Sequence, residues 1–281
     1  MKPSFIKGFF IHLTLIAICV LCLLPLVWLT STAFKGAGEN IFQYPPVFLP
    51  KEPTIENFKE VLKVVPIVGY VLNSFIVASL TVVFNVIFSA LAAYPLARMN
   101  FRGKKVLFFL ILATIMVPFQ AIMLPVYIIT LKLGLTDTMG VIPGYLGMVL
   151  PFAVNAFGIF LLRQAFLSIP KELEESAFID GCNVLQIWFK ILLPLISPQI
   201  VVLAIFTFIG SWGEFLWPSI ILTKEALFTL PVGINNMSSV FASNYRLVAA
   251  GSIISILPII IFFISLQKYF ISGRQEGAVK G

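Results

Sequence analysis

The residues best suited to chemistry in this sequence gather in one polar segment, residues 168–198 (SIPKELEESAFIDGCNVLQIWFKILLPLISP). Glu174, Glu175 and Asp180 are acids that can form charge-assisted hydrogen bonds with basic groups on a partner. The sequence contains no P-loop, no metal-spaced cluster of His and Cys, and no nucleophile–base pair that spacing suggests. We therefore expect binding chemistry, with no catalytic residue, no metal ligand and no cofactor bound by this chain.

Two short helices joined by a tight turn are predicted to position these acids. The run from Lys171 to Asp180 contains no helix breaker, and Pro170 suits the first turn of a helix, where a missing N–H costs nothing. Gly181 stands where a helix needs a left-handed terminating residue. Asn183, followed three residues later by Gln186, matches a capping box and predicts the start of the second helix.

The composition is that of a membrane protein. Apolar residues make up 59% of the chain and charged residues 11%, and the mean hydropathy is +1.03. A soluble domain carries about 25% charged residues, so lipid must solvate much of this chain. None of the three cysteines, Cys19, Cys22 and Cys182, falls in a predicted external loop, which argues against a disulfide framework.

Six segments approach the roughly 20 apolar residues that a spanning helix needs. They cover residues 9–32, 70–97, 106–130, 141–162, 196–222 and 247–270. The first is longer than the roughly 7–15 residues of a signal-peptide core, so we expect a retained transmembrane helix. The expected division is a first helix with its external loop (1–69), a core of five helices (70–270) containing a coupling segment (168–194), and a C-terminal tail (271–281).

The distribution of lysine and arginine predicts the orientation of the chain. With the N-terminus inside, twelve of these residues lie inside and seven outside, and the short 98–105 segment carries four positive residues and no acid. Both termini and the polar segment are therefore predicted to be cytoplasmic. The net charge of +7 follows from this pattern and needs no nucleic acid partner. Four acids in the polar segment also exclude a DNA-binding helix-turn-helix.

The spacing within the polar segment carries a family resemblance. The relevant residues are Glu175, Ser176, Ala177, Gly181, Ile191, Leu193 and Pro194. This pattern resembles the EAA loop of ABC importer permeases, which reads E-A-A, three residues, G, nine residues, I-x-L-P. Ser176 replaces an alanine and Cys182 a small residue, so both departures keep a small side chain. Residues 211–218 (SWGEFLWP, with Gly213 in place of asparagine) and the chain end from Gln267 are similar to carbohydrate permeases of the maltose-transporter type.

The resemblance implies an all-α, polytopic membrane protein with the type I ABC importer permease fold: six transmembrane helices and a cytoplasmic EAA coupling helix. It implies a permease subunit of an ATP-driven, binding-protein-dependent sugar importer in a bacterial or archaeal plasma membrane. The expected partners are a second homologous permease, two cytoplasmic ATPase subunits that hold ATP and Mg, and an external substrate-binding protein. The implied ATPase contacts are Glu174, Glu175, Ser176, Ala177, Asp180, Gly181 and Cys182.

The substrate pathway has weaker candidates. Glu214 is the one acid inside a predicted span, and it could act in function, by lining the pathway or bonding across helices, or serve structure alone. Trp212 and Trp217 could stack on sugars or form an interfacial belt. Asn73 and Asn155 are further candidates.

Two other functions stay open at this point. One is a stand-alone ion-coupled transporter or channel, and the other is a membrane scaffold that transports nothing. The single intramembrane acid and the absence of an evident inverted repeat argue against the first. The polar segment itself could be only a solvated amphipathic loop.

Overall fold

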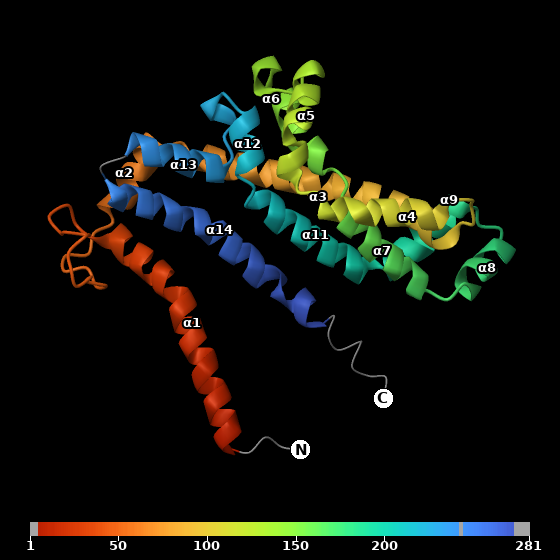
Figure 1. The fold of residues 1–281 in the computed structure, drawn as a ribbon, viewed down its shortest axis with the longest axis horizontal. Helices are drawn as coiled ribbons and strands as arrows, with labels where there is room; N and C mark the ends of the chain where they lie inside the picture. Colours follow the sequence, from red (N-terminus) through yellow and green to blue (C-terminus); the bar gives the residue numbers. More distant parts are fainter. Residues whose placement is uncertain (1–4, 242–243, 273–281) are drawn as a thin grey trace. The chain divides into compact units, whose positions relative to one another are not determined.

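The computed structural model describes residues 5–241 and 244–272, and these fold almost entirely as helices (Figure 1). Within these ranges the β pairing consists of one isolated antiparallel bridge between Lys35 and Pro53. The predicted all-α class is confirmed. The first elements are α1 (Phe5–Phe34), α2 (Glu56–Val64), α3 (Ile67–Arg98), α4 (Lys104–Ala113), η1 (Thr114–Met116), α5 (Phe119–Lys132), η2 (Asp137–Met139), α6 (Val141–Val149), η3 (Leu150–Phe152) and α7 (Ala156–Ser168).

The remaining elements begin with the polar segment. They are α8 (Glu172–Ile179), α9 (Val184–Ile187), the π-helical turn η4 (Trp188–Leu192), α10 (Leu193–Leu195), α11 (Ser197–Trp212), α12 (Leu216–Ile221), η5 (Glu225–Leu227), α13 (Leu230–Val240) and α14 (Tyr245–Ser272).

The chain packs into two compact units. Met1–Ile67 and Gly233–Pro258 form one, and Val68–Val232 with Ile259–Gly281 forms the other. In the first unit, buried side chains fasten the long loop after α1: Lys35 donates from Nζ to the carbonyl of Val47 at 2.7 Å, and Asn57 donates to the carbonyl of Ala33 at 2.8 Å. The division expected from the sequence, at residues 69 and 270, stays a prediction.

Three helical segments within the described residues are long and apolar enough to cross a membrane: Gly8–Phe34, Ile67–Arg98 and Phe119–Met139. The count reaches five when each of two bent helix pairs is taken as one span. These pairs are Val141–Phe152 with Ala156–Ser168, bent by 60°, and Val184–Leu195 with Ser197–Trp212, bent by 74°. The chain thus carries several membrane-spanning helices, while the number six stays a prediction.

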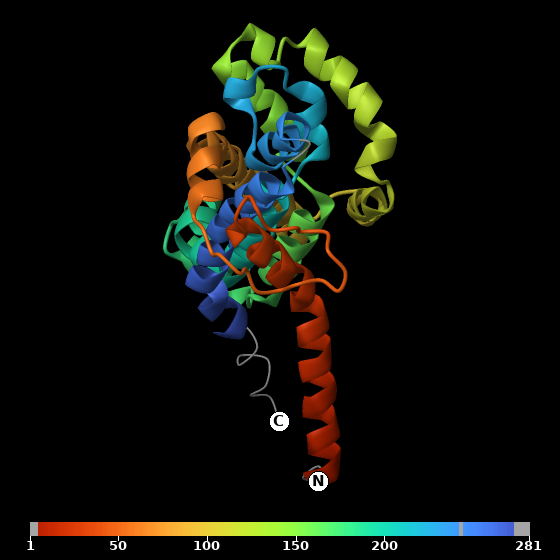
Figure 2. The ribbon, with the colours of Figure 1, turned by 90° about the vertical axis from the view of Figure 1, so that its left-hand side faces the viewer.

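The third predicted span, residues 106–130, is wrong as one continuous helix. The structure ends α4 at Ala113 and starts α5 at Phe119, and the chain changes direction between them (Figure 2). Val117 is extended, with φ −89° and ψ 111°, because a residue before proline avoids the helical region. Pro118 is also extended, so it separates two helices.

The core beside the polar segment relies on small residues of α3. Ala90, Ala93 and Ala97 are buried there against the large side chains Leu162 and Phe166 of α7. Small residues let helix backbones approach closely, as is usual in membrane bundles. This cluster continues through Ala177 of α8, Ile187 of α9 and Leu192 of η4. The carboxyl half of α3 therefore belongs to the same hydrophobic cluster as the polar segment.

Candidate functional site

The turn inside the polar segment forms as its sequence predicts. Gly181 adopts the left-handed conformation, with φ of 80°, directly after α8 and its C-cap Asp180. Asn183 accepts from the backbone N–H of Gln186 at 2.9 Å, and the Gln186 side chain accepts from the backbone N–H of Asn183 at 2.9 Å. The predicted capping box is confirmed. Local hydrogen bonds thus hold α8 and α9 in a defined hairpin.

The helix boundaries differ in two details from the sequence expectation. Pro170 lies before α8, which begins at Glu172 with Lys171 as its N-cap, so Pro170 is not in the first turn. The second helix turns π-helical at Trp188–Leu192 before α10 ends at Leu195. The chain then bends by 74° into α11.

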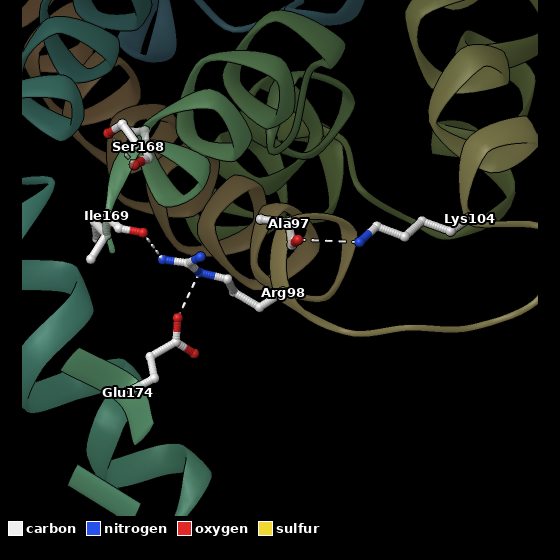
Figure 3. A network of polar contacts seen from close by, with 7 residues as sticks. Ala97, Arg98, Lys104, Ser168, Ile169 and Glu174 are labelled. Carbon is white, nitrogen blue, oxygen red and sulfur yellow. Dashed lines mark hydrogen bonds and ion pairs between the residues drawn. The ribbon is translucent and has the colours of Figure 1, made fainter. Parts of the chain in front are cut away.

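Glu174 forms an ion pair with a cation of its own chain. Its carboxylate Oε1 is 2.6 Å from Nε of Arg98, at the end of α3, and the two side chains are only 11% and 6% exposed (Figure 3). Nη2 of Arg98 also donates to the carbonyl of Ile169 at 2.6 Å. Glu174 was expected to meet basic groups of a partner, but a cation of its own chain already pairs with it. Sequence spacing cannot reveal a partner that lies 76 positions away, from 98 to 174.

The other predicted contact residues divide by exposure. Glu175, Ser176, Asp180 and Gly181 are exposed, whereas Ala177 is buried in the core and Cys182 is partly buried against it. Exposed apolar side chains accompany the acids on the same hairpin: Phe178 (50%), Ile179 (87%) and Leu185 (70%). The hairpin therefore presents a mixed acidic and apolar surface, which we call the docking surface, defined by Glu175, Phe178, Ile179, Asp180, Gly181 and Leu185.

Two further cations, Lys104 and Arg163, donate hydrogen bonds to carbonyls at the same end of α3. In the sequence they indicated only the orientation of the chain in the membrane. Lys104 donates from Nζ to the carbonyls of Ala97 at 3.1 Å and Met99 at 2.9 Å, and Arg163 donates from Nε to the carbonyl of Leu96 at 3.0 Å (Figure 3 shows the Lys104 bond). Cations at a helix C-terminus are favourable because the last carbonyls carry partial negative charge. Burial, followed by repulsion from the neighbouring cations Arg163 and Lys171, lowers the pKa of Lys104.

A cavity of about 560 Å³ lies in the same unit and contains two of the predicted pathway residues. Glu214 and Asn155 both line it, although Glu214 sits between α11 and α12 and not within a helix. One Glu214 oxygen accepts from the backbone N–H of Trp217 at 3.1 Å, and the Asn155 side chain caps α7 by accepting from Gly158 at 2.6 Å. The other lining residues are Thr81, Phe152, Phe157, Phe206, Thr207, Gly210 and Ser211. Hydroxyl, amide, carboxylate and aromatic groups together suit a polar ligand that has apolar faces.

The remaining candidates lie outside the lining of this cavity. Trp212 is 4% exposed and stacks on Phe208, with ring centroids 5.6 Å apart. Trp217 is fully buried and donates from its indole N–H to the carbonyl of Gly147 at 3.0 Å, so it is not an interfacial belt residue. Asn73 donates to two carbonyls of the segment before α13, those of Ala226 (2.9 Å) and Phe228 (3.0 Å). These contacts give Asn73 and Trp217 a structural role in this unit.

Asp137 also binds the backbone of the segment before α13. Asp137 of η2 is 1% exposed, and its carboxylate accepts from the backbone N–H groups of Thr223 and Lys224 at 2.6 Å each. Residues 223–226 are nevertheless exposed, so they form a surface loop on a fixed backbone. Among the residues searched, 5–241 and 244–272, no three acids, histidines or cysteines gather as a metal site would require.

The comparisons with known proteins agree on one class. A family model described as "Binding-protein-dependent transport system inner membrane component" matches residues 85–274. The chain is 34% identical to the arabinooligosaccharides transport system permease protein AraQ of Halalkalibacterium halodurans, over 100% of this chain and 99% of that protein. It is 32% identical to the diacetylchitobiose uptake system permease protein DasC of Streptomyces coelicolor, over 100% of both chains.

Solved structures give the same result for the fold. A bacterial ABC transporter involved in the import of the acidic polysaccharide alginate contains a chain that superposes with a TM-score of 0.81 at 28% identity, covering 96% of this chain and 98% of that one. A chain of the alginate transporter in complex with its pentasaccharide-bound periplasmic protein has a TM-score of 0.63 at 15% identity, covering 92% and 93%. This second likeness concerns the fold alone.

Proposed function

Because this chain belongs to the family of binding-protein-dependent transport system inner membrane components, we propose that it is one permease subunit of an ATP-driven sugar importer. Two full-length relatives are named for oligosaccharide uptake, which supports a sugar as the substrate. The family is that of the membrane component, and the chain itself is not an ATPase. We propose that two cytoplasmic ATPase subunits hold ATP and Mg, and that a second homologous permease completes the pathway.

The docking surface is the observation that carries this proposal. Its acids, Glu175 and Asp180, carry negative charge at positions where no basic side chain of the described chain forms an ion pair with them. Ile179 is 87% exposed next to them, and Phe178 and Leu185 are exposed on the same hairpin. Exposed apolar residues that are grouped and rimmed by polar residues are typical of an interaction site. A cleft with basic residues around an apolar floor would complement this surface. We propose that this cleft belongs to an ATPase subunit.

The orientation of the chain follows from this assignment. With the docking surface inside, the 98–105 segment with its four positive residues lies inside as well, in agreement with the positive-inside rule. Residues 223–226 then lie outside, on the side where a binding protein would deliver the sugar. We propose that both termini are cytoplasmic and that the protein resides in a bacterial or archaeal plasma membrane.

The cavity is the proposed contribution of this subunit to the sugar pathway. The Glu214 carboxylate and the Asn155 amide offer hydrogen bonds to hydroxyl groups, while Phe157 and Phe206 offer apolar surface to the carbon face of a sugar ring. Asn73, which binds backbone carbonyls, and Trp212, which is buried against Phe208, are not part of this proposed contact.

Cysteine cross-linking in the assembled complex tests the docking surface. In a chain whose Cys19, Cys22 and Cys182 are replaced by serine, Ile179→Cys should form a disulfide with a cysteine placed in the cleft of the ATPase subunit. Ile142→Cys is the matched control, because Ile142 is also highly exposed (71%) and lies at the start of α6. With the 98–105 segment inside, the chain crosses the membrane once before α6, so we propose that the start of α6 lies at the outer face. Ile142→Cys should not cross-link to the ATPase.

The same two variants report the orientation. In intact cells, or spheroplasts where an outer membrane is present, a membrane-impermeant maleimide should label Ile142→Cys and leave Ile179→Cys unlabelled. Two results would show that the docking surface does not contact the ATPase. One is labelling of Ile179→Cys from outside, and the other is its failure to cross-link in a complex that hydrolyses ATP and takes up sugar.

A further inference from the structure

A buried ion pair joins the polar segment to the carboxyl end of α3, and we infer that Arg98 and Glu174 are positioning residues through which movement of α8 reaches the cavity. The inference rests on the proposed function, since it concerns how closure of an ATPase is passed into the membrane part of this chain. It names a specific route, through α3, in addition to the covalent path from α9 into α11.

The pair can transmit displacement because its charges cannot separate cheaply. Arg98 Nε lies 2.6 Å from Glu174 Oε1, and the side chains are 6% and 11% exposed. Pulling them apart in this site would leave two buried charges without partners, which is strongly unfavourable. Arg98 also holds the carbonyl of Ile169, just before α8, at 2.6 Å. Movement of α8 therefore carries the end of α3 with it.

The helix α3 leads directly from this pair to the cavity. It is one continuous helix from Ile67 to Arg98, and Thr81 on the same helix lines the cavity. At 1.5 Å per residue, Thr81 lies about 25 Å along the helix from Arg98. Asn85 of α3 donates to the carbonyl of Phe152, another lining residue, at 3.2 Å. Axial displacement of α3 thus shifts one wall of the cavity and its neighbour.

The covalent path is less direct. Between α9 and α11 the chain passes through the π-helical turn η4 and a bend of 74°. π-Helical turns are frequent at functional sites and interrupt the regular hydrogen bonding of a helix. A displacement that enters at α9 is redirected at this bend before it reaches Glu214, which follows α11. By contrast, the contact between α8 and α3 involves two charged side chains and no intervening turn.

The test measures coupling in the complete complex of both permeases, the ATPase subunits and the binding protein. Glu174→Gln keeps the shape of the side chain but removes its charge, so α8 can slip relative to Arg98. We expect sugar uptake per ATP hydrolysed to fall by about fivefold or more, the usual lower range of coupling between sites, while ATP hydrolysis persists. The exchange Arg98→Glu with Glu174→Arg restores an opposite-charge pair and should recover most of the ratio.

Lys104→Gln is the matched control, because Lys104 of α4 is a cation that donates to carbonyls at the same end of α3, and none of its hydrogen bonds within the described residues reaches α8. It should lower the melting temperature of the complex and leave the ratio of uptake to hydrolysis unchanged. If Glu174→Gln lowers uptake and hydrolysis in proportion, the pair is merely structural and the inference is wrong. If the Glu174→Gln complex does not assemble, the ratio of uptake to hydrolysis is measured for Arg98→Lys instead. Lysine keeps the charge but lacks the guanidinium fork that reaches both Glu174 and Ile169. A wild-type complex without ATP-driven uptake would instead overturn the proposed function.

Discussion

Substitutions of Gly181 distinguish strain in the backbone of the turn from collision of a side chain with a partner subunit. Gly181 has φ of 80°, where a residue with a Cβ is strained by about 1–2 kcal/mol. A Cβ built at this position meets no atom of the chain within 4 Å. In this chain alone, therefore, Gly181→Ala, Gly181→Leu and Gly181→Trp should destabilise the turn by similar amounts, a factor of about 5–30 in its population.

The assembled importer should distinguish these three variants. If an ATPase subunit covers Gly181, the larger side chains collide with it, so sugar-stimulated ATP hydrolysis and uptake should fall from Ala to Leu to Trp. Thermal unfolding of the isolated subunit in detergent provides the comparison and should show nearly equal melting temperatures. Gly181→Asn is the control for the backbone, since asparagine tolerates the left-handed conformation better than alanine. Equal activity of the alanine and tryptophan variants in the complex would refute the idea that a partner seats on this turn.

Three further substitutions test the fold of the two units. Gly147→Ala should prevent correct folding, seen as loss of the monodisperse protein in detergent, because its Cβ would lie 2.0 Å from the backbone oxygen of Leu135; normal yield and melting temperature would contradict the packing. Asp137→Asn should destabilise the segment before α13 by about 1.5–3 kcal/mol, because it removes a charged acceptor of two backbone N–H groups. The measurement is the rate of proteolysis at residues 222–230, which should rise. A hydrogen bond from the backbone N–H of Lys51 lowers the pKa of Glu39 below its ordinary value. The ionised carboxylate therefore stabilises its loop above about pH 4, and this contribution is lost as pH falls through the lowered pKa. Glu39→Gln should abolish that pH dependence of loop proteolysis, and an unchanged profile would assign it to another group.

Local signals in the sequence were reliable where the chemistry is local. The capping box of Asn183 and Gln186 and the left-handed Gly181 each depend on residues within three positions, and the structure contains both. Pro118, which separates α4 from α5, shows the limit of local signals, because proline kinks and helix ends have the same local signature and only the surrounding packing decides between them.

Long-range pairing is what sequence reasoning missed. Glu174 and Glu175 are neighbours of the same type, yet α8 turns one into the core beside Arg98 and the other to the surface. No periodicity within a segment of eight residues identifies which acid has a distant partner. Likewise, Asn155 and Glu214 meet at one cavity, whereas Asn73 binds backbone carbonyls elsewhere. Polar residues within apolar segments indicate candidate pathway residues, but the sequence does not show which of them line the same cavity.

Sugar uptake by the complex reconstituted in liposomes distinguishes an ATP-driven importer from an ion-coupled transporter. For the importer, we expect uptake that requires ATP, the ATPase subunits and the binding protein, and that persists when ion gradients are collapsed by ionophores. Uptake by this chain alone, driven by an ion gradient, lost with Glu214→Gln and indifferent to ATP, would establish an ion-coupled transporter instead.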